Sequence, residues 1–385
     1  MNWKQPTCLL KGIVLLIGVI IFGGAIYFAN YDRLTTEYNT NSLLDFETAT
    51  VIQILEDHTF IDSNYPEIVQ GSVTVELEIL TGPYKGEIVE ATQYLTRLVN
   101  VRFNEGDRVS VRISTLDEEL VSVAFDSFER REVLIACILI FFLTLAIIGG
   151  KRGLMSVASL IFTLSCIIFL LIPLMLKGYP AILTTIVILS VVAFVTLLLL
   201  FGITSKMIIS LLGCVVGVVS AAVIATVVGN MIYISGFNME NTDQLLVLVD
   251  INEYSLQPHG LFISGILIAT LGAVMDTAVS IASAMEEIQL TNPHIGFKQL
   301  FKSGMNIGRD VMGTMSNTLI LAFAGTALNM IIIIYVSQLS FNQIINTDFI
   351  ALEIIRGVAG SLGIILTVPA VAFMGAKRYT KKSSR

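Results

Sequence analysis

The chain has 385 residues, of which 55% are hydrophobic and 14% are charged, and its formal net charge is −7. A soluble domain usually carries about 25% charged residues, so this composition argues against a soluble enzyme, a nucleic-acid-binding protein and a disordered protein. It predicts a membrane protein that crosses the bilayer several times.

The first apolar run covers residues 12–29, which is close to the roughly 20 residues that a helix needs to cross the hydrocarbon layer. A signal peptide cleaved after Ala29 would place Tyr27 three positions before the cut, where a small residue is required. We therefore expect residues 1–29 to form a short cytoplasmic N-terminus and an uncleaved first transmembrane helix.

Residues 30–132 form a polar, acidic segment with 20 acidic and 8 basic residues and no cysteine. Within residues 46–128, apolar and polar side chains alternate with period two over 73–79, 109–113 and 121–125, which is typical of half-buried strands. Five or six short strands in so short a segment predict a small all-β barrel of the OB-like or SH3-like kind. The absence of cysteine excludes a disulfide framework from this segment.

Seven further apolar runs follow this domain: 133–149, 154–176, 180–202, 207–234, 261–285, 311–336 and 351–375. Together with the first run they predict an α-helical polytopic membrane protein of about eight transmembrane helices, with the β domain between helices one and two. We expect residues 133–376 to form a seven-helix transmembrane bundle and residues 377–385 to form a basic tail.

The lysine and arginine residues outside the β domain predict the orientation of the chain, because cytoplasmic loops carry an excess of them. With eight spans, all the basic loops fall on one side of the membrane. The residues concerned are Lys4, Lys11, Lys151, Arg152, Lys206, Lys298, Lys302, Arg309 and the basic tail. We therefore expect both termini to be cytoplasmic and residues 30–132 to be extracytoplasmic.

The sixth predicted span carries the clearest functional candidate, Asp276, because an ionisable group inside the membrane is costly and usually serves a function. Asp276 belongs to a stripe of small and polar residues spaced three or four apart, which places them on one helix face. The stripe consists of Gly265, Ala269, Gly272, Asp276, Ser280, Ser283 and Glu287. Small residues permit close helix packing, so we expect this face to point into the bundle.

The seventh predicted span begins with Arg309 and Asp310, and Thr314 and Asn317 share the face of Asp310. The two spans run antiparallel, so Asp276 and Asn317 are expected to meet at similar depth. We expect Arg309 to pair with Asp310 or with a glutamate near the end of span six. Two interpretations stay open: a polar clasp that fixes helix packing, or the lining of a path for a proton, cation or polar solute.

Other patterns in the sequence carry less chemistry. Glu353 and Arg356 are three residues apart near the outer end of span eight, and we interpret them as an exposed ion pair. No phosphate-binding loop, HExxH or CxxC metal spacing occurs, so we expect neither an enzyme nor a bound cofactor or metal, and no catalytic residue is assigned.

Two long motifs resemble the YibE/F-like family of membrane proteins. They are GAVMDTAVSIASA over residues 272–284 and GMNIGRDVMGTMSNTLILA over residues 304–322. Shorter matches at 151–154 and 177–180 extend the resemblance to about residues 130–375. It implies a multi-pass plasma-membrane protein of a bacterium, of a kind loosely described as permeases, without established catalytic residues. Asp276, Arg309, Asp310 and Asn317 fall on the matching motifs.

These observations support two hypotheses of function. In the first, the protein is a permease that moves a small solute or ion near helices six and seven. In the second, it is a non-transport scaffold or signalling component that binds partners through its outer β domain. The expected partners are the lipid bilayer and, as the resemblance implies, a shorter paralogous member of the family; a homo-oligomer stays open, and no nucleic acid is expected.

Overall fold

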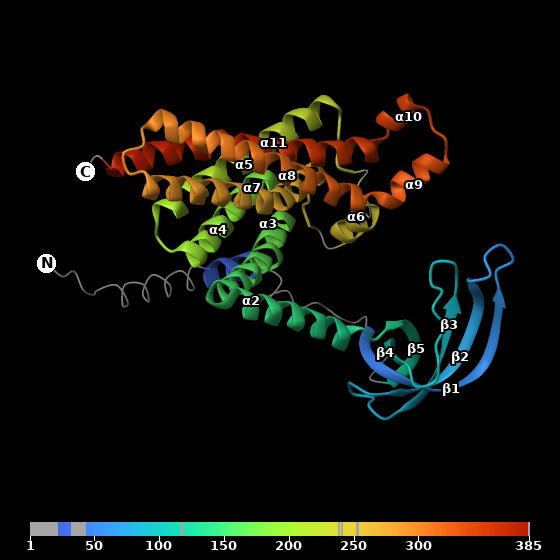
Figure 1. Ribbon diagram of the computed structural model, residues 1–385. Coiled ribbons are helices and arrows are strands. Elements are labelled where there is room, and N and C mark those ends of the chain that lie inside the picture. The colour runs from blue at the N-terminus through green and yellow to red at the C-terminus, as the bar shows by residue number, and fades with distance from the viewer. Residues whose placement is uncertain are drawn as a thin grey trace. The chain divides into compact units, whose positions relative to one another are not determined.

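The computed structural model describes residues 22–31, 44–116, 119–237, 239, 242–251 and 254–383. The chain divides into two compact units: one is Thr35–Thr144, and the other is Leu145–Arg385 with the segment up to Leu34. Figure 1 shows strands in the first unit and helices in the second. The first part of predicted span one, with Lys4 and Lys11, lies outside the described residues, as do residues 384–385 of the predicted tail.

The β domain is a five-stranded antiparallel sheet with the order β3-β2-β1-β4-β5. Its strands are β1 (Leu44–Ile61), β2 (Val69–Ile79), β3 (Ile88–Leu95), β4 (Arg108–Leu116) and β5 (Glu119–Phe128). The long strand β1 has register shifts after Val51 and after Ile54, and it pairs with β4 along its first part and with β2 along its second. Strands β3 and β5 approach each other, so the sheet curls into a near-barrel.

The core of this domain confirms the predicted alternation along the strands. The apolar residues of β2 and β4 are fully buried: Val73, Val75, Leu77, Ile79, Val109, Val111 and Ile113. Phe103 closes the core, with its ring centroid 4.4 Å from that of Phe125 and 5.5 Å from that of Phe128. The period-two pattern therefore places one face of each strand inside, as alternation of side chains requires.

Strand β5 leads almost directly into the first long helix, α2 (Arg131–Cys166). The N–H of Glu129 donates to the carbonyl of Arg108 at 3.0 Å, and the carboxylate of Glu129 accepts from the N–H of Arg131 at 2.9 Å. Arg108 also pairs with Glu132 in the first turn of α2 at 3.0 Å. The start of the helix is thus tied to the sheet by backbone and side-chain bonds.

The rest of the chain is helical. After α2 come η1 (Ile167–Leu171), α3 (Ile172–Leu176), α4 (Ala181–Phe201), α5 (Ser205–Met231), α6 (Thr242–Ile251), α7 (Pro258–Thr291), α8 (Phe297–Thr326), α9 (Leu328–Val336), α10 (Phe341–Ile345) and α11 (Asp348–Ser383). Among the described residues, five helices are long and apolar enough to cross a membrane, or six if α8 and α9 form one span. This finding shows a multi-pass membrane protein.

The structure and the predicted spans agree best in the middle and at the end of the chain. Helices α4, α5, α7 and α11 match the predicted fourth, fifth, sixth and eighth spans. The predicted seventh span is broken, because α8 and α9 meet at an angle of 64°. The predicted second and third spans lie in one candidate of 46 residues, Arg131–Leu176.

That 46-residue candidate is interrupted at Gly150, which has φ 54° and ψ −133°. Gly153 lies against the backbone of Leu145 and Ala146, so the chain turns sharply between them. A positive φ of this kind costs glycine little and other residues more. The turn divides the apolar stretch close to the boundary between the predicted second and third spans.

The N-terminal helical segment, residues 22–31, packs on the region that follows this turn. The rings of Phe22 and Phe162 lie 5.0 Å apart, and the amide of Asn30 donates to the carbonyl of Phe169 at 2.8 Å. The ammonium group of Lys177 donates to the carbonyl of Phe28 at 2.9 Å. The part of the first predicted span that is described therefore belongs to the helical unit.

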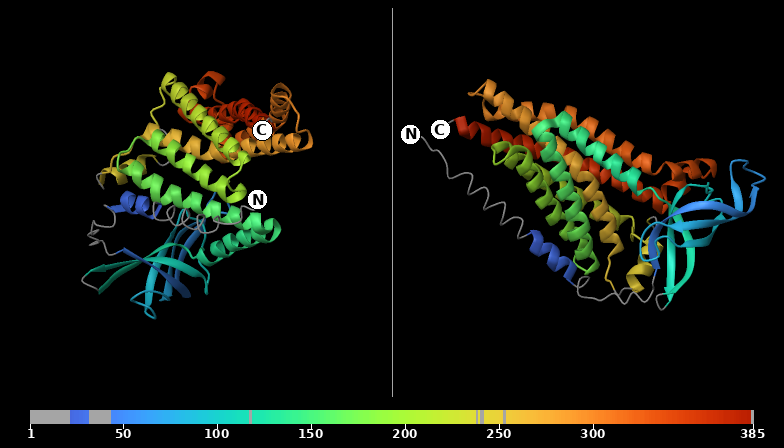
Figure 2. Two further views of the ribbon diagram at one scale, coloured as in Figure 1. Left: turned by 90° about the vertical axis from the view of Figure 1, so that its left-hand side faces the viewer. Right: turned by 90° about the horizontal axis from the view of Figure 1, so that it is seen from below.

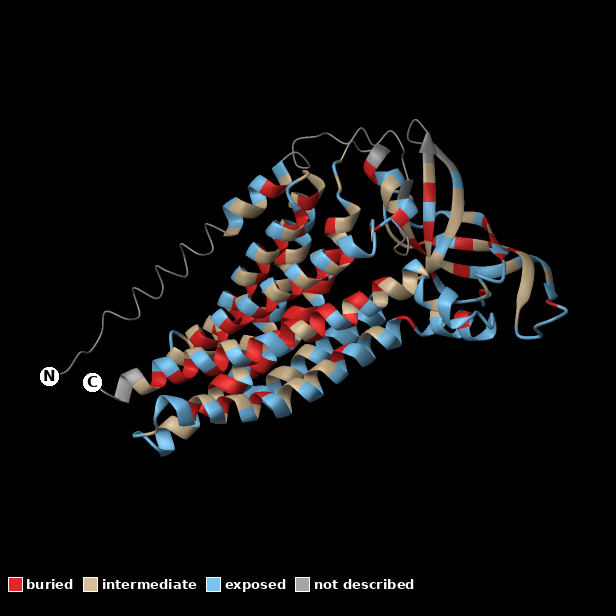
Figure 3. Ribbon diagram, turned by 90° about the horizontal axis from the view of Figure 1, so that it is seen from above, coloured by how far each residue is buried: buried red, intermediate tan, exposed pale blue. Residues whose placement is uncertain are grey.

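Helices α5, α7 and α11 form the centre of this unit, with α4 and α8 packed on them (Figure 2). Gly217 on α5 allows the closest approach: a side chain there would meet Thr367 of α11, and it would lie 2.7 Å from Val274 of α7 and 3.1 Å from the carbonyl of Gly363. Buried residues follow the faces along which these helices meet (Figure 3). Gly213, Gly217 and Gly363 therefore allow α5 and α11 to pack closely.

Candidate functional site

The stripe of candidate residues on α7 lies on an uncovered face of the chain. Gly265, Ala269, Gly272, Asp276, Ser280 and Glu287 are exposed, and Ser283 is half-buried, with its hydroxyl bonded to the carbonyl of Val279 at 2.7 Å. A side chain at Gly265 or Gly272 would find no other atom within 4 Å. The prediction that this face points into the bundle is wrong for the single chain.

The opposite face of α7 explains this outcome. Val274, Ala278 and Ile281 are fully buried against the neighbouring helices. Burial of these larger apolar side chains gives more contact than burial of glycine and serine, so the apolar face takes the interior position. The polar face is therefore left uncovered in the single chain.

The candidates on α8 are also exposed. Arg309, Asp310, Thr314 and Asn317 all lie on the surface of the described chain. The guanidinium of Arg309 donates to the side-chain oxygen of Asn306 at 3.3 Å, and no ion pair of Arg309 occurs among the described residues. Within the same part of the chain, no bond joins Asp276 to Asn317. The predicted pairing of Arg309 with an acid and the predicted clasp within one chain are therefore wrong.

A cavity of about 340 Å³ lies at the end of the helical unit where α7 and α11 begin and α8 ends. The residues that line it come from four helices (α6, α7, α8 and α11), the segment before α6 and the break after α8: Met239, Thr242, Leu245, Leu261, Phe262, Gly265, Thr326, Ala327, Phe349, Leu352, Glu353 and Arg356. The volume is within the range of small-molecule sites, about 300–1,000 Å³. Most of the lining is apolar, with few charged groups.

Glu353 and Arg356 provide the charges in this cavity. The Nη1 atom of Arg356 donates to Oε1 of Glu353, and the two side chains are 31% and 13% exposed, respectively. The guanidinium carbon lies 5.5 Å from the centroid of the Phe262 ring. The prediction of an exposed pair is wrong, because both side chains are partly buried and line the cavity. An ion pair inside a predicted span was the signal that could have marked them.

The second carboxylate oxygen of Glu353, Oε2, is buried and has no hydrogen-bond partner among the described residues. Burying a charged group without its hydrogen bonds costs free energy, so an orphaned carboxylate oxygen in a protein interior calls for an explanation. This oxygen belongs to a residue that lines the cavity, and it is the clearest unsatisfied acceptor there.

The break between α8 and α9 forms part of the cavity wall. Ala327 has φ −86° and ψ 3°, so it leaves the helix between Thr326 and Leu328, and it is buried. Within a membrane, backbone that departs from a helix is tolerated where it lines a cavity or is covered by protein. Broken helices of this kind form the binding sites of many transporters.

Gly265 connects the cavity to the exposed stripe. It lines the cavity and is also the first residue of the stripe on α7. Asp276 follows eleven residues later, about 16 Å along the same face. The structure therefore places the cavity and Asp276 at two points of one open helix face.

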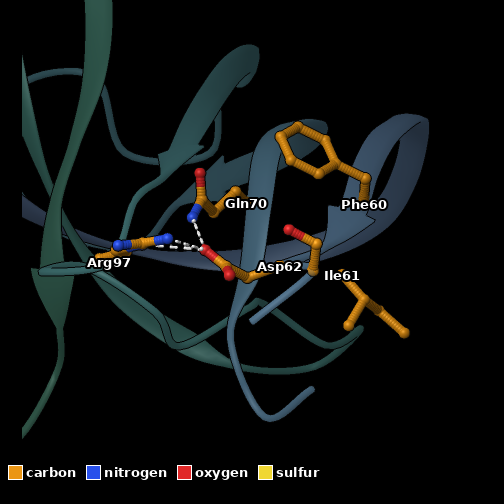
Figure 4. A pocket seen from close by; sticks show the side chains of 6 residues that line it. Phe60, Ile61, Asp62, Gln70 and Arg97 are labelled. Atoms are coloured by element: carbon orange, nitrogen blue, oxygen red, sulfur yellow. Dashed lines mark hydrogen bonds and ion pairs between the residues drawn. The ribbon is translucent and has the colours of Figure 1, made fainter. Parts of the chain in front are cut away.

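A second cavity, of about 400 Å³, lies in the β domain (Figure 4). Asp62 is at its centre, with the side chains of Gln70 and Arg97 directed toward it. The Asp62 carboxylate accepts from Gln70 Nε2 at 2.5 Å, from Arg97 Nε at 2.9 Å and from the N–H of Asn64 at 2.9 Å. The protein itself satisfies this carboxylate, so we assign Asp62 a structural role.

This role predicts a pH dependence. The N–H of Asn64 and, after it, the guanidinium of Arg97 hold the pKa of Asp62 below its ordinary value of 3.8. A lowered pKa stabilises the folded state above that ordinary value, and this contribution is lost as the pH falls through the folded-state pKa. We expect Asp62→Asn to lower the protection of β2 amides from hydrogen exchange at pH about 7, with a smaller difference from wild type at an acidic pH well below the ordinary pKa of 3.8.

Hydrogen exchange of the full chain, compared between variants at each pH, measures this effect. Glu78→Gln, which changes an exposed acid on β2, serves as the control and should show no such difference. A loss of protection in the Asp62 variant that is equally large at both pH values would show that the charge of Asp62 does not contribute.

Comparison with known proteins gave one match. Residues 137–381 match the family model described as YibE/F-like protein, and this range contains the cavity and every candidate residue on α7 and α8. No curated protein and no solved structure matches the chain. In the described residues, no group of three His, Cys, Asp or Glu side chains could hold a metal ion. Since the matched range covers well over half of its length, the chain belongs to the YibE/F-like protein family.

Proposed function

We propose that this protein is a permease for a small polar solute, without a catalytic role. The observation that carries the proposal is the cavity between the broken α8–α9 span and α11, because it holds an ion pair inside an otherwise apolar helical unit. An ion pair there is costly to bury unless it serves a function, and intramembrane charges commonly mark solute paths.

The path proposed here begins at this cavity and follows the open face of α7 to Asp276. Gly265 and Gly272 leave space along this face, and Ser280 continues the polar surface beyond Asp276. Thr314 and Asn317, exposed on α8, provide further polar groups on the helical unit. Asp276 would carry a proton or a cation during transport.

The proposed topology has eight spans, with both termini in the cytoplasm of a bacterial cell. The 46-residue stretch Arg131–Leu176 would be about 69 Å long as one straight helix, more than twice the roughly 30 Å hydrocarbon layer. The turn at Gly150 supports two crossings instead, with Lys151 and Arg152 directly after the turn. These residues lie on the predicted cytoplasmic side.

A scaffold function is the second candidate, and the open face of α7 favours it. A carboxylate such as Asp276 is not stable against lipid, so in the bilayer this face needs a cover. A second copy of the chain or a shorter family member would provide one. In this alternative the polar groups hold an assembly together, and no solute crosses.

A block of the cavity tests the permease proposal. Gly265→Leu adds a bulky side chain at a residue that lines the cavity, and no atom lies within 4 Å of the position of its Cβ. We expect proteoliposomes with wild-type protein to take up at least one solute from a panel of labelled amino acids, sugars, organic acids and inorganic ions. The variant should lose at least about nine-tenths of this uptake while keeping its melting temperature.

Gly24→Leu is the matched control, since it makes the same change at an exposed glycine outside the cavity lining and the proposed path, where no atom lies within 4 Å of the added Cβ. It should retain uptake. Absence of flux for every member of the panel, with protein that is folded and correctly inserted, would contradict the permease proposal and favour the scaffold.

A further inference from the structure

The charges in the cavity limit the kinds of ligand that fit it. Glu353 and Arg356 cancel each other, so the cavity does not attract a simple cation or anion strongly. The walls are largely apolar, and Leu245, Phe262 and Phe349 are among the lining residues. A ligand that suits this site combines apolar surface with one positive and one negative group.

Each member of the ion pair has unused bonding capacity. Arg356 has five N–H donors, and among the described residues only its bond to Glu353 is present. Within the described parts of the chain, Oε2 of Glu353 accepts no hydrogen bond. The terminal torsion of a glutamate is soft, so its rotation on ligand binding would bring this oxygen toward the cavity that the residue lines. A carboxylate fits the guanidinium in the usual two-bond geometry, and an ammonium group fits the free carboxylate oxygen.

We propose that this cavity binds a small zwitterion, an α-amino acid with an apolar side chain. Its ammonium group lies against Glu353, its carboxylate binds Arg356, and its side chain packs against the apolar wall near Phe262. The inference deepens the proposed function, because it names the substrate class of the same site. The orphaned oxygen of Glu353 is the observation that calls for a donor on the ligand.

Binding measurements on the full-length protein in detergent test the chemistry. The probe is tritium-labelled leucine, competed by leucine, by isocaproate, which lacks the ammonium group, and by isoamylamine, which lacks the carboxylate. We expect leucine to bind saturably and each analogue to bind at least about tenfold more weakly, because each loses a charge-assisted hydrogen bond. Equal binding of leucine and both analogues would overturn the proposal.

Two isosteric or near-isosteric variants assign the groups. Glu353→Gln should weaken the binding of leucine at least about tenfold and leave the affinity for isocaproate unchanged. Arg356→Met should weaken the binding of leucine and leave the affinity for isoamylamine unchanged. A variant that merely fails to fold would lose all ligands together, so the retained analogue shows that the site is intact. Lys302→Gln, which changes an exposed charge on α8, is the control.

The head group of a zwitterionic lipid offers similar chemistry, with a phosphate in place of the carboxylate. Nanodiscs of phosphatidylglycerol, with and without phosphatidylethanolamine, separate the two sources. Free leucine should bind in both kinds of disc with the same affinity. If phosphatidylethanolamine abolishes leucine binding at all leucine concentrations, the site belongs to the lipid, and the proposal of a free amino acid is overturned.

The failure of this inference is distinguishable from the failure of the proposed function. If Gly265→Leu blocks the uptake of a sugar or an inorganic ion and the protein binds no leucine, the zwitterion site is overturned and the permease function is supported. If leucine binding requires Glu353 and Arg356 but no solute enters proteoliposomes, the zwitterion site is supported and the proposed permease function is overturned.

Discussion

Asp276→Asn is expected to reduce transport at least about tenfold while leaving the chain as stable as wild type, within about 0.5 kcal/mol. The asparagine keeps the shape of the side chain and removes its capacity to carry a proton or bind a cation. Asp276 is exposed, and it has no hydrogen bond or ion pair among the described residues, so its replacement removes no contact within the chain. Uptake into proteoliposomes and the melting temperature measure the two effects.

Two control experiments make this result specific. Glu286→Gln changes another acid on α7 that lies off the stripe, and this variant should retain transport. The wild-type protein and the Asp276 variant should also have the same mass by light scattering. Full flux in a folded Asp276→Asn variant would contradict the proposed path, whereas a lower mass with unchanged monomer stability would identify Asp276 as part of an interface between chains.

Gly217→Ala should destabilise the helical unit by about 1–3 kcal/mol, the cost of overpacking a filled core. A methyl group at Gly217 would overlap Thr367 and lie 2.7 Å from Val274, where three helices meet. Alanine is favoured over glycine in a helix by up to about 1 kcal/mol, so the loss must exceed that gain. Thermal unfolding of the monomeric protein in detergent micelles measures the change in stability.

Gly272→Ala provides the contrast within the same set of helices. No atom lies within 4 Å of the position of its Cβ, so only the gain in helix propensity remains, and the variant should be up to about 1 kcal/mol more stable. The two substitutions are chemically identical and are expected to have opposite signs. If Gly217→Ala stabilises the chain as Gly272→Ala does, the close approach of α5, α7 and α11 is contradicted.

Features set by local pattern could be predicted from the sequence. The alternation along β2 and β4 placed the core of the β domain, because successive side chains of a strand face opposite sides. The lengths of the apolar runs predicted α4, α5, α7 and α11. The family resemblance is confirmed over residues 137–381.

The direction of a helix face and the covering of a charged pair could not be predicted in the same way. Both faces of α7 carry small residues, and only the packing with α5, α8 and α11 decides that Val274 lies inside and Asp276 outside. Glu353 and Arg356 line a cavity together with residues of α6 and α7, which precede them by about 90 residues or more. Such long-range contacts leave no local periodic signal.

The junction between β5 and α2 has a mechanical consequence. Two residues separate the strand from the helix, and the bonds of Glu129 and the Arg108–Glu132 pair tie the helix to the sheet. Such a connection has no slack, so the sheet and the first turn of α2 move as one rigid piece. A ligand or partner that tilted the β domain would therefore tilt the start of this helix with it.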